Sequence, residues 1–133
     1  MVSERSEKLK IYHILSQTDW AAAQTEGVYH PTSLETEGFI HCSAGCQVLR
    51  TANLYYAGRD DLLVLCIVVD RVQADIHYED TAGLGMDFPH IYGPLNLDAV
   101  DQVLPLALDP SGNFILPPLI EIQRKGSGIF SKV

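Results

Sequence analysis

One short stretch decides how the chain is expected to fold: Gly38-Phe39-Ile40-His41-Cys42-Ser43. An apolar, strand-like run carries a histidine and stops at a serine, which is a residue type that caps helices. Residues two apart on a strand point to the same side, so we expect His41 and Ser43 to face one cavity. The alternative is that Ser43 is a plain helix cap and His41 a polar residue of the core.

The residues that follow have the pattern of a helix. Apolar side chains recur at helical spacing between Val48 and Tyr56, and Gly58 is a natural end. We therefore expect a helix over about residues 44–57. Arg50 is its one cation, and this side chain either steers an anionic ligand or simply faces water.

Several strands are indicated on either side of this region. Residues 9–15 include His13 and carry apolar side chains on both faces, which predicts a strand buried between layers. The eight apolar residues 62–69 are bounded by charges and predict a fully buried central strand. Further strands are expected at residues 75–79, 88–92 and 103–108, the last one at an edge or a bulge because it contains a proline.

The order of the elements indicates the fold class. An earlier helix is expected to begin with Thr18 as its cap and to end at Gly27. Helices come early and strands accumulate later, which favours an α+β fold with two main helices over a doubly wound fold. An antiparallel barrel with peripheral helices is the alternative. We expect a single domain over residues 1–133, with a core at about 9–120 and loose ends at 1–8 and 124–133.

Composition and charge exclude some classes of function. The formal net charge is -8, and a general nucleic-acid binder would instead show a basic patch or stripe. The polar start of the chain lacks the apolar core of a signal peptide, and its longest apolar run is far shorter than the roughly 20 residues of a membrane helix. We therefore expect a soluble, cytoplasmic protein; the pattern leaves its oligomeric state open.

Metal binding is a minor hypothesis. Cys42 and Cys46 are four residues apart, a spacing that occurs among zinc ligands, but no second ligand pair follows at a suitable distance. The histidines also lack the close pairing on one element that transition metals often use. We expect no metal, and a small metal-binding protein remains the third of three hypotheses.

A second group of polar residues lies on the expected strand 88–92. His90 and Tyr92 share one face of that strand, and prolines and a glycine fix the backbone at its ends. A pocket lined by these two residues with His13 and His41 would supply proton carriers, a phenol donor and aromatic surface. The alternative is that each of them is a separately satisfied polar residue.

Two further residues complete the candidate site. Glu79 ends an expected strand beside a loop with two glycines, so it is the best candidate for a functional carboxylate. It could accept a ribose hydroxyl or stabilise a developing cation; the alternative is a solvated residue at a strand end. Trp20 is a candidate stacking platform for a ligand, although a lone tryptophan more often anchors a core.

Two longer motifs carry a resemblance to a known family. These are residues 38–43 and the stretch Phe88-Pro89-His90-Ile91-Tyr92-Gly93-Pro94, accompanied by Tyr12-His13, Trp20 and Gln47. Over roughly residues 11–106 the chain resembles the uncharacterised family catalogued as domain of unknown function 952. That family looks related to the ADP-ribosyltransferase fold, which implies a split, mostly antiparallel sheet. Residues 41–43 with the helix behind them resemble its RNA 2′-phosphotransferase branch.

The resemblance implies a cleft for NAD or an ADP-ribose-like nucleotide. His13 matches the first-strand histidine that contacts the ribose, and Phe39, His41 and Ser43 would line the same cleft. His90 and Tyr92 would do proton or donor work, with Glu79 as a stabiliser of an oxocarbenium ion. Ile14-Leu15 stand where active members have Gly-Thr. From the resemblance, the leading hypothesis is an ADP-ribosyltransferase-like or 2′-phosphotransferase-like protein. The second hypothesis, which fits the change at residues 14–15, is a non-catalytic binding module that kept the cleft.

Overall fold

A computed structural model describes residues 9–120 and contains three antiparallel sheets. The loose ends expected at residues 1–8 and 124–133 lie outside the described residues. In the first sheet, β4 (Leu62–Val68) lies between β1 (Lys10–Ser16) and β8 (Val100–Pro105). The expectation of a buried central strand is confirmed, and Pro105 lies on an edge strand, as its missing N–H requires.

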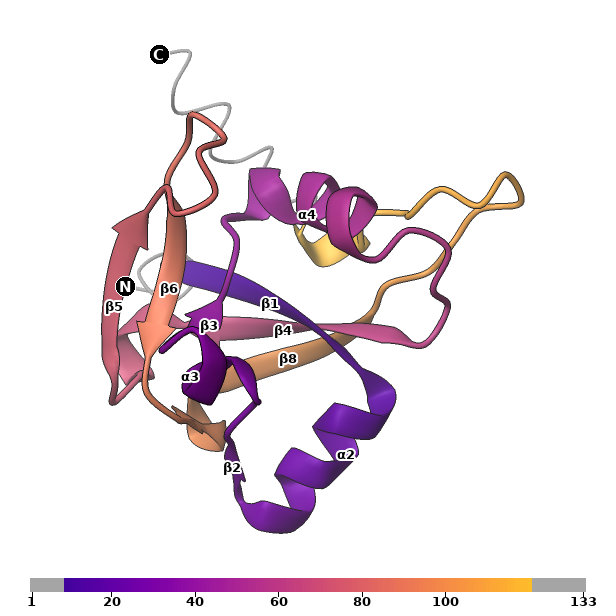
Figure 1. Cartoon of the computed structure of the whole chain (residues 1–133). Coiled ribbons are helices and arrows are strands. Elements are labelled where there is room, and N and C mark those ends of the chain that lie inside the picture. Colours follow the sequence, from indigo (N-terminus) through magenta and orange to yellow (C-terminus); the bar gives the residue numbers. More distant parts are fainter. Residues whose placement is uncertain (1–8, 121–133) are drawn as a thin grey trace, which may run out of the picture.

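The second sheet runs steeply across the first. It has the order β3 (Ile40–His41), β6 (Phe88–Tyr92), β5 (Asp75–Glu79). In Figure 1, β5 and β6 stand upright beside the flat-lying strands β1, β4 and β8. A third, two-stranded sheet pairs β2 (Val28–Tyr29) with β7 (Leu95–Asn96).

One bridge joins the first two sheets. Just beyond β3, Ser43 pairs with Tyr12 of β1: the Tyr12 N–H donates to the Ser43 carbonyl at 2.8 Å, and the Ser43 N–H donates to the Tyr12 carbonyl at 2.7 Å. Because β1 also pairs with β4, this bridge carries the pairing from one sheet to the other. It therefore fixes the end of β3 against the middle of β1.

Both faces of β1 and β4 are buried, because the side chains that point to either face of these strands are mostly apolar. Ile11 and Leu15 pack into one hydrophobic core together with Ile40 and Ile91 of the second sheet. Tyr12 and Ile14 pack into another core on the other face. The expected burial of the first strand between layers is confirmed.

The first helix, α2 (Gln17–Glu26), begins two residues earlier than its sequence suggests. Ser16, the last residue of β1, is the N-cap, because its Oγ accepts from the Asp19 N–H at 3.0 Å. Thr18 was expected to cap this helix, and that expectation is wrong. Gly27 ends the helix in the left-handed conformation with φ 82°, as expected.

The second main helix is shorter than predicted. A 3-10 turn (Gly45–Gln47) precedes α4 (Val48–Tyr55), and α4 lies over the β1 side of the molecule (Figure 1). Ser43 is not its cap, because the Ser43 backbone is paired with β1 and its Oγ bonds to Thr51 Oγ1 at 3.0 Å. The Gln47 side chain instead accepts from the Ala44 N–H at 2.9 Å and satisfies the start of the turn.

Short elements complete the chain. They are α3 (Ser33–Thr36) and two further 3-10 turns, Val69–Arg71 and Leu97–Ala99. The α+β class with antiparallel sheets and few helices is confirmed, and the described strands form open sheets in place of a closed barrel. Within residues 9–120, no helix is long and apolar enough to cross a membrane.

Candidate functional site

A cavity of about 550 Å³ opens between β1, the end of β2, the residues around β3, and α4. Five of its lining side chains carry benzene or phenol rings, and two are histidines. Its charged side chains are two arginines and two carboxylates. The ring-bearing and charged residues that line it are Tyr29, Phe39, Tyr55, Tyr56, Phe88, His13, His41, Arg50, Arg59, Asp19 and Glu37.

His13 borders this cavity and is held by neutral partners. Its Nδ1 lies 2.6 Å from the His41 carbonyl oxygen, and its Nε2 lies 2.7 Å from the Tyr29 hydroxyl. Burial lowers the pKa of His13 to about 4, so the ring is neutral at pH 7. A carbonyl only accepts, so Nδ1 carries the proton and the Tyr29 hydroxyl donates to Nε2. The ring is therefore fixed in one tautomer.

His41 lies at the wall of the same cavity, and β-sheet register places it beside His90. These two residues are direct partners across β3 and β6. His41 Nδ1 lies 3.3 Å from His90 Nε2, while His41 Nε2 is buried and has no hydrogen-bond partner among residues 9–120. Burial, together with the neighbouring His90 and His13, lowers the pKa of His41 to about 4.

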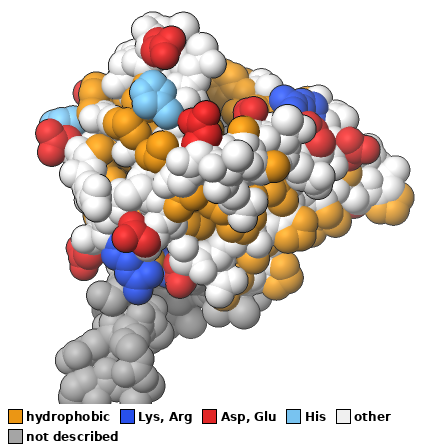
Figure 2. Space-filling model, turned by 90° about the horizontal axis from the view of Figure 1, so that it is seen from below, with side chains coloured by type: hydrophobic (Ala, Val, Ile, Leu, Met, Phe, Trp, Pro, Cys, Tyr) orange, Lys and Arg blue, Asp and Glu red, His pale blue; other side chains and the backbone are white. Residues whose placement is uncertain are grey.

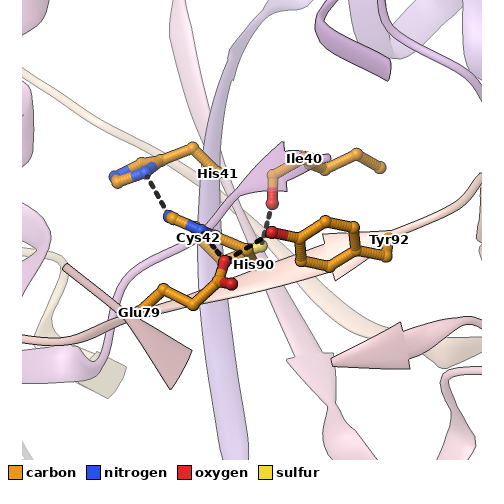
Figure 3. A network of polar contacts seen from close by, with 6 residues as sticks. All are labelled: Ile40, His41, Cys42, Glu79, His90 and Tyr92. Carbon is orange, nitrogen blue, oxygen red and sulfur yellow. Dashed lines mark hydrogen bonds and ion pairs between the residues drawn. The ribbon is translucent and has the colours of Figure 1, made fainter. Parts of the chain in front are cut away.

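His90 connects His41 to a carboxylate nearer the surface (Figure 3). The His90 side chain is only 1% exposed, and its Nδ1 lies 2.9 Å from Glu79 Oε1. The Tyr92 hydroxyl donates to the same oxygen at 2.6 Å. These hydrogen bonds, from Tyr92 first and then His90, hold the pKa of Glu79 below its ordinary value. Glu79 is therefore an ionised acceptor at pH 7.

The register of the second sheet explains this cluster. Three residue pairs lie opposite one another on β5 and β6: Asp75 with Tyr92, His77 with His90, and Glu79 with Phe88. All six side chains therefore share one face, and Glu79 and His90 are diagonal neighbours within reach of one another. Phe39 stacks on His90 with ring centroids 4.0 Å apart and planes 11° apart.

The structure divides the expected site residues into two groups. His13, His41, Phe39 and Arg50 line the cavity, whereas His90, Tyr92 and Glu79 do not. The expectation of one pocket lined by His13, His41, His90 and Tyr92 is therefore wrong. Phe39 stacks on the His90 ring and the Tyr92 hydroxyl bonds to Glu79, whereas Phe88, on the same face of β6, does line the cavity. The histidines are still linked, since His13 bonds to the backbone of His41 and His90 to its ring.

Ser43 and Trp20 also lie away from the cavity. Ser43 is 2% exposed and bonds to Thr51, so the prediction that it faces the same space as His41 is wrong. The chain changes its pairing partner from β6 to β1 between these residues, and the alternation of a single flat strand does not hold across that change. Trp20 packs against the hydrophobic core, as a lone tryptophan commonly does.

Several lining residues were missed at the level of sequence. Tyr29 lies at the site because β2 pairs with β7, and a strand of two residues has no local sequence pattern that predicts it. Tyr55 and Tyr56 were assigned only to the apolar face of the expected helix. The sequence signal that could have identified them is their position at the end of the expected helix, just before Gly58. Arg59 follows them, and its guanidinium lies 5.9 Å from the Tyr56 ring centroid.

The two arginines differ in their availability. Arg59 forms a bidentate ion pair with Asp61, with its Nε 3.0 Å from Oδ1 and one terminal nitrogen 2.7 Å from Oδ2. Arg50 is exposed and forms no ion pair within the described part of the chain. Arg50 is therefore the cation that is free to meet a ligand. Residues 9–120 contain no group of three or more His, Cys, Asp or Glu side chains that could hold a metal.

Comparisons with known proteins place the chain in a family. A family model described as a protein of unknown function, DUF952, matches residues 14–103. The crystal structure of protein CC0527 from Caulobacter crescentus is 34% identical, with a TM-score of 0.75 over 84% of this chain and 98% of that chain. Its solution NMR structure is 35% identical, with a TM-score of 0.69 over 78% of this chain and 90% of that chain.

A search of the curated proteins found no match. The family model nevertheless spans more than half of the chain and includes both of the motifs that carry the resemblance, residues 38–43 and 88–94. The chain therefore belongs to DUF952, a family of proteins of unknown function.

Proposed function

We propose that the cavity binds a nucleotide-type ligand of the NAD or ADP-ribose class. The observation that carries the proposal is the cavity itself, whose volume of about 550 Å³ falls in the usual range of small-molecule sites. Tyrosine and phenylalanine rings, one unpaired arginine and two carboxylates line one space. A nucleotide has a chemical group that can contact each of these: a base for the rings, a phosphate for the arginine and ribose hydroxyls for the carboxylates.

The chemistry of each part supports this assignment. Nucleic-acid bases stack on aromatic side chains, and Tyr55 and Tyr56 offer such rings at the cavity wall. An arginine binds phosphate through charge-assisted hydrogen bonds, which is the role we assign to Arg50. Carboxylates accept hydrogen bonds from ribose hydroxyls, and Asp19 and Glu37 are the lining carboxylates.

The surface charge agrees with a small ligand better than with a nucleic-acid chain. On the face shown in Figure 2, Asp and Glu side chains are dispersed and Lys and Arg side chains are few. A long polyanion needs a basic stripe along its path. A mononucleotide or dinucleotide needs only one local cation such as Arg50.

Isothermal titration calorimetry with ADP-ribose, NAD and adenosine tests the proposal. Arg50→Ala is expected to weaken ADP-ribose at least tenfold, because it removes a charge-assisted hydrogen bond worth about 1.5–3 kcal/mol. Adenosine has no phosphate, so Arg50→Ala should leave its affinity unchanged. Arg71→Ala removes an exposed arginine outside the cavity and is the matched control.

Two results would contradict the proposal. One is the absence of binding heat with both ADP-ribose and NAD. The other is an equal loss of ADP-ribose affinity in Arg50→Ala and Arg71→Ala, since general surface charge would then account for the effect.

ADP-ribosyl or 2′-phosphotransferase chemistry on this ligand is the second candidate function. It is favoured by His13, which borders the cavity with its ring fixed in one tautomer. The oxocarbenium role expected of Glu79 would pass to Asp19 or Glu37, because Glu79 does not border the cavity. Nicotinamide release from NAD measures this activity, and release at an unchanged rate in His13→Ala would contradict it.

A further inference from the structure

We infer that His41, His90 and Glu79 form a proton relay between the cavity and the protein surface. This inference goes beyond ligand binding, since it assigns acid–base chemistry to the site. It rests on the proposed function in one respect only: a bound ligand supplies or receives the proton at His41. The relay itself is a property of the protein without ligand.

The contacts of Glu79, at the outer end of the relay, determine which nitrogen of each histidine carries the proton. Glu79 accepts from the Tyr92 hydroxyl at 2.6 Å, so its oxygen faces donors and the group is a carboxylate. His90 Nδ1, 2.9 Å from the same oxygen, must therefore carry a proton. Neutral His90 then has a free lone pair on Nε2. The facing Nδ1 of His41, at 3.3 Å, is the donor to it.

This leaves the lone pair of His41 on Nε2, at the inner end of the relay. That atom is buried and has no partner among the described residues, although the ring belongs to the cavity wall. The aromatic neighbours of the ring are Tyr55 and Phe88, whose centroids lie 6.4 and 5.2 Å from its own. The relay requires a ligand to reach this atom from the side of Tyr55, which is 57% exposed, because Phe88 is buried.

The transfer step balances without any further reactant. A ligand hydroxyl gives its proton to His41 Nε2, and the ligand oxygen keeps the electron pair. The proton on His41 Nδ1 crosses to His90 Nε2, so His41 stays neutral and changes tautomer. His90 then carries a proton on each nitrogen, and its positive charge rests beside the Glu79 carboxylate. The reverse sequence delivers a proton to the ligand.

The other groups around the relay do not offer a competing place for the charge. His13 touches His41 only through the backbone carbonyl, and its own two nitrogens are already engaged. Tyr92 donates to Glu79, and this hydrogen bond raises the pKa of its phenol. His77 packs edge-on against Tyr92, with ring centroids 5.0 Å apart. Glu79 is thus the carboxylate in contact with His90.

Nitrogen NMR of histidine-labelled protein tests the relay without any ligand. At neutral pH, His41 should carry its proton on Nδ1. In the same spectrum, His90 should carry its proton on Nδ1 and leave Nε2 as the acceptor of the His41 proton. Glu79→Gln keeps the shape but replaces the carboxylate by an amide that can also donate, so the preference of both rings for the proton on Nδ1 should weaken. Glu35→Gln, at an exposed position outside the cavity, is the matched control and should leave it unchanged.

Three outcomes would overturn the inference. His41 would hold its proton on Nε2 at neutral pH, or His90 would hold its proton on Nε2, or both rings would show a mixture of tautomers. An unchanged tautomer preference in Glu79→Gln would likewise remove the carboxylate from the relay. None of these results bears on whether ADP-ribose binds, so the relay and the proposed function fail independently.

Discussion

His13 and His90 are two buried histidines that both contact His41, yet their surroundings differ. The His13 ring lies between a backbone carbonyl and the Tyr29 hydroxyl, which are both neutral. The His90 ring lies between another histidine and the carboxylate of Glu79. Neutral partners hold a buried ring uncharged, whereas a carboxylate gives it a place to hold positive charge. The same residue type therefore has only neutral partners on one side of the site and an anionic partner on the other.

Acid titration of stability should show the largest effect. The folded pKa of His13 is about 4 against an ordinary 6.5, so the unfolded chain binds a proton there that the folded chain does not. Stability is full above pH 6.5 and falls as the pH drops toward 4, by about 3 kcal/mol for this one group. Urea denaturation over this range should show a smaller loss in His13→Gln than in the native sequence. Equal losses in the two proteins would contradict a His13 that is held neutral.

Removing the other histidine sharpens the comparison at fixed pH. His90→Leu takes away the acceptor of His41 and the stacking partner of Phe39, so we expect the free energy of unfolding to fall by about 2 kcal/mol. His77→Leu, on the exposed edge strand β5, is the control and should change it by less than about 0.5 kcal/mol. Chemical denaturation at pH 7 measures both. A His90→Leu protein as stable as His77→Leu would mean that the relay contacts are not formed.

The two tyrosines at the ends of these contacts give the smallest difference. Tyr29→Phe removes a buried donor and leaves His13 Nε2 unpartnered, which should cost about 1 kcal/mol. Tyr92→Phe removes a hydroxyl from a side chain that is 38% exposed, and water can replace it on Glu79. Thermal unfolding should therefore show a clear decrease in melting temperature for Tyr29→Phe and a smaller one for Tyr92→Phe. The reverse order would show that the outer contact is the stronger of the two.

Much of the fold could be predicted because local sequence patterns determine its main strands. The strands near residues 9–15 and 62–69 are apolar throughout, and such runs have few alternatives. Helix starts were less predictable, since Ser16 and Thr18 are both residue types that commonly cap helices. Ser16 is the N-cap of α2 because β1 ends at this residue. Gly27, in contrast, marked the end of α2 correctly because few other residues adopt its conformation.

The site was predicted as a set of residue types but not as an arrangement. His13, His41 and His90 were identified from their strands, and they do lie close together. Their division between a cavity and a relay depends on sheet register, which pairs His90 with His41 and brings Glu79 to its other nitrogen. The register of β3 on β6 is set by contacts between segments about 50 residues apart, and no local pattern reports it. Tyr29 was missed for the same reason.

The central claim is that the cavity holds a nucleotide-type ligand beside His13 and His41. Amide and side-chain NMR spectra recorded during a titration with ADP-ribose test it most directly. The account predicts saturable shifts at His13, His41, Arg50 and Tyr55, with the other hydrophobic core near Leu104 and Phe114 unaffected. Saturable shifts confined to residues outside the cavity, or no shifts at millimolar ligand, would contradict it.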